Sequence, residues 1–330
     1  MPAEPSTKAT AWAIFDRIVA DAAPGGVHTN PWLRNGNALT YVPDFRVLRK
    51  LLAVPLYLDA PSTTGVPALA LDVWLSYELR RAGFDSDAVW PRASDPRIMP
   101  GAISSLLEAL PQKERLLIEQ RLRRSMKGVS GSSASVLGKH YMKQVDVVMS
   151  DWDTGPELLI STKRMDSSFG KNAANRVEES YGDAKNLRLR HPLAALGFVY
   201  GLRSTILSTE PDKAEWLNDL LGKLGTEDDA YHAVALVMID HDAEVSEPDD
   251  EVDSLEKAEP DTLFEIVDVE TAKVDEALAA LPDIAIRHDA VPEQLQPARF
   301  LQTMVARVLD VSPVTRHREA RFRRNTAPQM

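Results

Sequence analysis

The order of helical and strand-like patterns between residues 113 and 240 most constrains how this 330-residue chain can fold. β-branched runs indicate strands, and apolar residues three and four apart indicate helices. In chain order, the predicted elements are a helix over 113–127, strands over 140–149 and 157–163, a helix over 172–190, a strand over 192–202, a helix over 214–224 and a strand over 230–239. Turn-forming residues between the first two strands predict an antiparallel hairpin. This order favours an α/β fold in which one mixed β-sheet is flanked by helices.

The segments outside this core are predicted to be mostly helical. Apolar spacing indicates helices over 11–22 and 67–82 before the core, and over 271–281 and 292–309 after it. We therefore divide the chain into a helical region for recognition or dimerisation at 1–110, a core at 111–242, an acidic linker at 243–260 and a helical region at 261–330 that ends in an arginine-rich tail.

Composition excludes several classes of protein. The chain has no cysteine, so disulfides, zinc–thiolate sites and cysteine nucleophiles are ruled out. Its apolar fraction of 44% is too high for a disordered chain. It lacks an apolar run of the roughly 18 residues that cross a membrane, and its start does not resemble a signal peptide. We expect a cytoplasmic protein with no membrane partner.

The net charge of −11 is unevenly distributed along the chain. Residues 240–270 contain 14 acidic residues and one basic residue, so the remainder is close to neutral. Residues 113–203 contain 16 basic and 10 acidic residues. Because the local field decides which ligand a surface attracts, this basic segment leaves nucleic acid open as a partner. A solvated surface of mixed charge explains the same counts equally well.

The predicted hairpin carries residues suited to chemistry. Side chains alternate between the two faces of a strand, so Ser161 and Lys163 share a face and Thr162 points to the other. Asp146 is the single acid in an apolar stretch of the preceding strand. A carboxylate is costly to bury there unless a metal, a cation or hydrogen-bond donors offset its charge.

The predicted helix at 172–190 offers a second carboxylate. On a helical wheel of about 100° per residue with Val177 at zero, Glu178 falls at about +100° and Glu179 at about +200°. The apolar face, centred near Val177, therefore has Glu178 at its edge, and Glu179 is expected to point into solvent. Asp146, Lys163 and Glu178 are predicted to converge at one end of the hairpin.

Two carboxylates beside a lysine suit metal-assisted hydrolysis of a phosphodiester. Carboxylate oxygens hold Mg²⁺, and the metal neutralises phosphate charge and lowers the pKa of a bound water. The lysine would orient that water or stabilise developing charge. An ordinary ion pair between Lys163 and Glu178, with Asp146 a residue at a strand end, remains the alternative. Glu157 lies too far along its strand from Lys163 to be the second acid.

An acid followed by (Glu/Asp)-x-Lys on adjacent strands resembles the PD-(D/E)xK nuclease superfamily, whose fold is called restriction-endonuclease-like. The chain departs from this pattern in two places, because Val145 replaces the usual proline and Ser161 replaces the second acid. One group of type II restriction endonucleases has this Ser-x-Lys form, with the acid displaced to the following helix. Here 14 residues separate Lys163 from Glu178. The similarity covers roughly residues 113–240.

The resemblance implies a Mg²⁺-dependent endonuclease that acts on double-stranded DNA, in restriction or another anti-phage defence. It implies Asp146 and Glu178 as metal ligands and Ser161 and Lys163 as further catalytic residues. A cut through both strands usually needs two active sites, so a homodimer or homotetramer is expected. A protein that binds DNA without cleaving it, on a decayed nuclease fold, is the alternative that Ser161 suggests.

The loop before the predicted helix carries candidate DNA contacts. Arg164, Lys171, Asn172 and Arg176 would hold phosphates without reading sequence. Small residues in the same loop would let backbone N–H groups approach a phosphate at the helix start.

Overall fold

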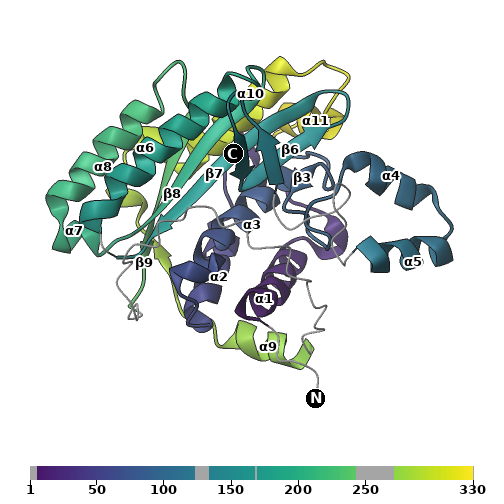
Figure 1. Ribbon diagram of the computed structural model, residues 1–330, viewed down its shortest axis with the longest axis horizontal. Helices are drawn as coiled ribbons and strands as arrows, with labels where there is room; N and C mark the ends of the chain where they lie inside the picture. The colour runs from purple at the N-terminus through teal and green to yellow at the C-terminus, as the bar shows by residue number, and fades with distance from the viewer. Residues whose placement is uncertain (1–5, 123–133, 168, 243–270, 330) are drawn as a thin grey trace.

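A six-stranded mixed sheet forms the centre of the protein. The computed structural model describes residues 6–122, 134–167, 169–242 and 271–329 (Figure 1). The strands lie in the order β10-β9-β8-β7-β6-β3. Their bounds are β3 Val89–Trp90, β6 Val147–Asp151, β7 Gly155–Met165, β8 Ala195–Arg203, β9 Ala233–Asp240 and β10 Ala285–Ile286. The α/β class and the mixed sheet with flanking helices, both predicted from the sequence, are confirmed.

The three central strands are parallel. β8 lies between β7 and β9, and it pairs with both in parallel register. β6 pairs with β7 as the predicted antiparallel hairpin, and β3 and β10 are short antiparallel edges. β8 is buried along both faces because helices cover the sheet on each side.

One face of the sheet is covered by the helices that connect the parallel strands. α6 (Phe169–Arg188) joins β7 to β8, and α8 (Pro211–Leu224) follows β8 after the short α7 (Ile206–Thr209). Alternate residues of β8, among them Phe198 and Tyr200, point into this layer. Figure 1 shows α6 and α8 side by side along one side of the sheet.

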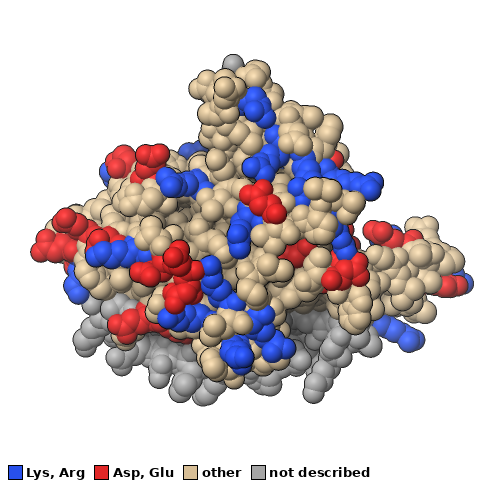
Figure 2. Space-filling view, turned by 90° about the horizontal axis from the view of Figure 1, so that it is seen from above, with Lys and Arg blue, Asp and Glu red and all other residues tan. Residues whose placement is uncertain are grey.

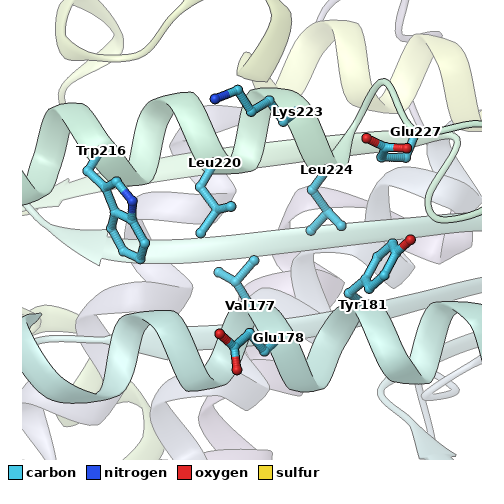
Figure 3. Close-up of a pocket in the computed structure, with 8 residues that line it drawn as sticks. All are labelled: Val177, Glu178, Tyr181, Trp216, Leu220, Lys223, Leu224 and Glu227. Carbon is cyan, nitrogen blue, oxygen red and sulfur yellow. The ribbon is translucent and has the colours of Figure 1, made fainter.

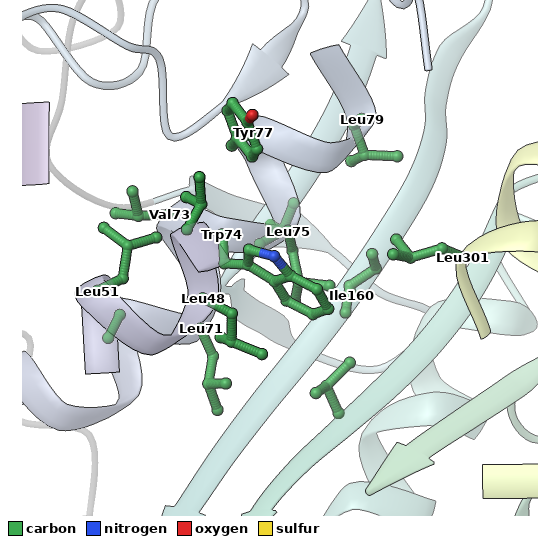
Figure 4. Packing of buried hydrophobic residues seen from close by; sticks show 14 of the residues in the cluster. Leu48, Leu51, Leu71, Val73, Trp74, Leu75, Tyr77, Leu79, Ile160 and Leu301 are labelled. Carbon is green, nitrogen blue, oxygen red and sulfur yellow. The ribbon is translucent and has the colours of Figure 1, made fainter. Parts of the chain in front are cut away.

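The other face is covered by helices from both ends of the chain. α2 (Phe45–Tyr57), α3 (Val66–Arg81) and α10 (Pro297–Val311) lie on the sheet, and α1 (Thr7–Ala22) and α9 (Thr271–Ala279) complete this side by packing on α2 and α3 and on α1, respectively. Trp74 of α3 is fully buried and belongs to the same buried cluster as Ile160 of β7 and Leu301 of α10 (Figure 4). α2, α3 and α10 therefore pack on the same sheet as the predicted core.

Smaller elements complete the described structure. Two hairpins, β1 (Trp32–Asn35) with β2 (Ala38–Tyr41) and β4 (Ala134–Leu137) with β5 (Met142–Val145), lie outside the main sheet. α4 (Gly101–Ala109) and α5 (Gln112–Leu122) form a helical pair, and α11 (Arg318–Asn325) is the last of the described helices. None of the described helices is long and apolar enough to cross a membrane.

Several sequence expectations need correction. The region at 1–110, expected to be mostly helical, also contains the strands β1 and β2, and no expectation covered α2. The strand expected over 140–149 is two strands, because the chain leaves the β4 ladder at Val145 and joins β7 from Val147. The acidic linker at 243–260 lies outside the described residues.

Gly83 allows the end of α3 to meet α11. Its φ is +97°, and a Cβ built on it would lie 2.8 Å from the backbone N of Ala320. We expect Gly83→Ala to lower the free energy of unfolding by about 2–4 kcal/mol, because it adds left-handed strain to a backbone clash. Gly182→Ala is the matched control, since a Cβ at this position on α6 would have nothing within 4 Å.

Urea denaturation of both variants measures the difference. The control should gain about 0.5–1 kcal/mol from helix propensity. Equal effects of the two substitutions would contradict this account of Gly83.

Candidate active site

Asp146 lies where the chain passes from β5 to β6. Its Oδ2 accepts a hydrogen bond of 2.8 Å from the backbone N–H of Thr162 in β7. Burial raises the pKa of Asp146, while the Thr162 N–H and the ammonium groups of Lys163 and Lys143 lower it in opposition. Asp146 is thus a partly buried acid held against β7 with two lysines near it.

Alternation along β7 divides its polar residues between two layers. The Lys163 ammonium faces α6, and Ser161, which is buried, lies against the Tyr231 hydroxyl. Thr162 and Arg164 point to the opposite layer, where they reach Asp72 and Pro67 of α3. Ser161 and Lys163 therefore share a face, as the strand pattern predicts.

Asp72 is a second acid at this point of the sheet. The Thr162 hydroxyl donates a 2.6 Å hydrogen bond to its Oδ1. Burial, and then the nearby charge of Asp146, raise the pKa of Asp72 well above its usual value. Sequence reasoning missed this residue, although a single acid in the apolar run ALALDVWL was a detectable signal.

The carboxylate beside Lys163 belongs to Glu179. Glu179 Oε2 lies 3.8 Å from Lys163 Nζ, and Oε1 lies 3.9 Å from Lys143 Nζ. Glu178 instead lines a groove of about 410 Å³ between α6 and α8. Figure 3 shows Glu178 beside Val177, across from Trp216 and Leu220 of α8. Glu179 is exposed, as predicted, but it and not Glu178 is the carboxylate beside Lys163, which corrects the expected convergence of Glu178 with Lys163.

Buried polar residues explain this difference. Ser180, Asp183 and Asn186 of α6 are all at least nine-tenths buried, so the buried face of the helix includes polar side chains that an apolar wheel leaves out. At about 100° per residue, their inclusion turns the buried face away from Glu178 and brings Glu179 to its edge.

The β4–β5 hairpin supplies the partners of these buried residues. Asp183 Oδ2 lies 2.9 Å from Lys143 Nζ, and Asp183 Oδ1 accepts a 3.0 Å hydrogen bond from the Tyr141 hydroxyl. Asn186 Oδ1 accepts the backbone N–H of His140 at 2.8 Å. These contacts hold β5 against α6 and place Lys143 beside Glu179. Neither Lys143 nor Asp183 is among the site residues predicted from the sequence.

The candidate DNA contacts are only in part at the surface. Arg164 is 6% exposed and pairs with Asp166 at 2.9 Å, so the expectation that it meets DNA is wrong for this structure. Arg164 is two residues after Thr162 on β7, so its side chain is on the same face and points toward α3. Arg176 is partly buried on α6. Lys171 and Asn172 lie in the first turn of α6, but their side chains fall outside the described positions.

Asp146, Glu179, Lys143 and Lys163 form a cluster, and the carboxylate oxygens of this cluster fit a hard cation such as Mg²⁺. Among the described residues, no three His, Cys, Asp or Glu side chains group as a ready metal site. Asp146 and Glu179 are two carboxylates near Lys163, and Mg²⁺ commonly takes one or two carboxylates with water and substrate phosphate as its other ligands. A cation beside Asp146 would also offset the cost of burying its charge.

Comparison with known families, curated proteins and solved structures finds no match to this chain. What the cluster can do therefore follows from its own chemistry. It combines the partly buried carboxylate of Asp146, the carboxylate of Glu179 on α6 and the ammonium groups of Lys143 and Lys163.

Asp72→Asn should make the protein more stable at neutral pH. The raised pKa of Asp72 means that the folded state keeps a proton that the unfolded state releases above about pH 4. Folding of the natural protein is therefore penalised increasingly as the pH rises, whereas asparagine carries no such penalty. The expected gain is roughly 1–3 kcal/mol at pH 8, shrinking toward pH 4.

Urea denaturation between pH 5 and pH 8 measures this gain. Asp219→Asn is the control, because Asp219 is exposed on α8 beside Lys223. Its effect should stay within about 0.5 kcal/mol across this range. A loss of stability in Asp72→Asn that grows with pH would contradict the assignment.

Proposed function

We propose that this protein is a Mg²⁺-dependent endonuclease that hydrolyses phosphodiester bonds in double-stranded DNA. The observation that carries the proposal is the meeting of Asp146, Lys163 and Glu179 at the junction of β6, β7 and α6. The order of hairpin, helix and parallel strand supports a restriction-endonuclease-like core and a relation to the PD-(D/E)xK nucleases.

Each residue of the cluster has a role in this proposal. Asp146 and Glu179 would hold the metal, which supplies phosphate neutralisation and an acidified water. Lys163 would orient the attacking water and stabilise charge on the phosphate. Ser161, in the place of the usual acid, would hold the strand in register through Tyr231. Glu178, the metal ligand expected from the sequence, is replaced here by Glu179.

The surface charge is compatible with a phosphate backbone as ligand. Figure 2 shows Lys and Arg side chains running through the middle of one face, with acidic groups among them. Phosphate contacts of this kind position a duplex without reading its sequence. We propose restriction or another anti-phage defence as the biological role, in the cytoplasm and with two or more copies acting together.

DNA binding without cleavage is the second candidate function. The observation that favours it is the contact of Glu179 with both lysines, which gives that carboxylate cationic partners without a metal. The replacement of an acid by Ser161 points the same way.

Substitutions at the neighbouring residues Glu179 and Glu178 test which of the two carboxylates is the metal ligand. We expect Glu179→Gln to reduce Mg²⁺-dependent cleavage of plasmid and phage DNA at least about 100-fold, because a metal ligand is lost. Glu178→Gln, one residue away and facing the groove, should stay within about threefold of the natural protein. Lys163→Ala and EDTA should abolish cleavage.

Gel assays of cleavage and of DNA mobility measure the outcomes. Circular dichroism of each variant controls for folding. A larger loss in Glu178→Gln than in Glu179→Gln would overturn the assignment made here. Salt-sensitive mobility shifts with no cleavage under any divalent cation would support the binding protein instead.

The pH dependence of cleavage gives an independent prediction. Burial raises the pKa of Asp146, so this residue takes up a proton at a higher pH than an ordinary aspartate does. As the pH is lowered, activity should therefore begin to fall at that higher pH. Mg²⁺ competes with the proton, so a higher Mg²⁺ concentration should move this acidic limb to lower pH. Single-turnover rates from pH 4.5 to 8 measure it, and a limb unaffected by Mg²⁺ would contradict a metal role for Asp146.

A further inference from the structure

α4 and α5 form a helical pair that projects from the body of the protein. It extends at the right of Figure 1 and of Figure 2. α5 packs mainly against α4. Every residue of α5 is exposed except Glu119, which is partly buried, and Leu122, which is 3% exposed.

The projecting helix exposes large apolar side chains. Leu116, Leu117 and Ile118 are 58%, 54% and 36% exposed. Of the residues of α5, the structure buries only Leu122. Contiguous exposed apolar residues on a projecting element indicate a surface that associates with a partner.

One face of α5 has a symmetric arrangement of side chains. Glu114, Leu117, Ile118 and Arg121 are spaced at i, i+3, i+4 and i+7, so they lie along one side of the helix. The two apolar residues are central, the acid is in the first turn and the base is in the last turn. Among the described residues, neither Glu114 nor Arg121 has an ion-pair partner.

We propose that this face, which we call the α5 face, pairs with the same face of a second copy of the chain. In an antiparallel pairing about a two-fold axis, Leu117 would pack on Ile118 of the partner subunit. Glu114 would then lie opposite Arg121 of the partner subunit, and the same pair would form again across the axis. The two helix dipoles would also run in opposite directions, which is the favourable arrangement.

The charges favour a second copy over another kind of partner. An acidic partner, or a basic one such as a peptide, would satisfy one end of the face and be repelled at the other. Only a surface with the reverse order of charge matches both ends, and the α5 face supplies that order when turned through the two-fold axis.

The contact is small, and this sets the expected strength. Two short helix faces bury less than the ~1,600 Å² of a standard complex, so the dimer should be weak, with a dissociation constant on the order of 10 μM. The inference concerns assembly and stands whether or not the protein cleaves DNA.

Charge reversal provides the test. We expect Glu114→Arg and Arg121→Glu each to weaken self-association about tenfold or more, because two attractive pairs become two repulsive ones. An equimolar mixture of the two variants should associate again, since one variant then has bases at both ends of the α5 face and the other has acids at both ends. Lys113→Glu, a charge reversal away from the α5 face, should leave association unchanged.

Sedimentation velocity on the full chain, from about 1 to 200 μM, measures each species. Circular dichroism controls for the overall folding of each variant. Rescue in the mixture supports the inference, and no merely structural effect of the single substitutions would produce it. A chain that stays monomeric at the highest concentration, or a dimer indifferent to both reversals, overturns it.

Discussion

Two hydrogen bonds made by Thr162 are the interaction on which the site depends. Its backbone N–H binds Asp146, and its hydroxyl binds Asp72 of α3. The first bond holds the strand crossover against β7, and the second ties that strand to the helical layer behind it. Because both acids are taken from water here, the surrounding charges decide whether the fold can keep them. Lys143 and Lys163 are the cations that lower the pKa of Asp146 against burial.

The sequence was sufficient for the order of elements but not for the phase of α6. Strands 192–202 and 230–239 and the hairpin were readable because apolar and β-branched runs report burial directly. The orientation of α6 could not be predicted in this way, because Ser180 and Asp183 are buried by tertiary partners that lie far away in the sequence. Tyr231 donates to the Ser180 carbonyl at 2.9 Å, and Lys143 pairs with Asp183. An apolar wheel counts such residues as solvent-facing, so it places Glu178 rather than Glu179 beside Lys163.

Arg164 and Asp72 are two further residues whose surroundings could not be predicted from the sequence. A basic residue near a candidate site suggests phosphate binding, yet strand alternation already turns position 164 away from Lys163. Asp72 occupies a helix that is buried on nearly every side, and its hydrogen bond to Thr162 and its proximity to Asp146 link it to the site. Sequence periodicity assigns a face to a residue, whereas the layer that covers this face is set by long-range topology.

The two helical surfaces of the protein differ in what their exposed apolar residues can bind. The groove between α6 and α8 has Glu178 and Glu227 at its margin, and Lys223 there is engaged by Asp219. Its charge pattern has no internal symmetry and selects no occupant. The α5 face, in contrast, carries opposite charges at equal distances from an apolar centre. A two-fold axis reverses the order of these charges, so the α5 face is complementary to the same face of a second copy. This pairing would not involve the residues that position Asp146 and Lys163.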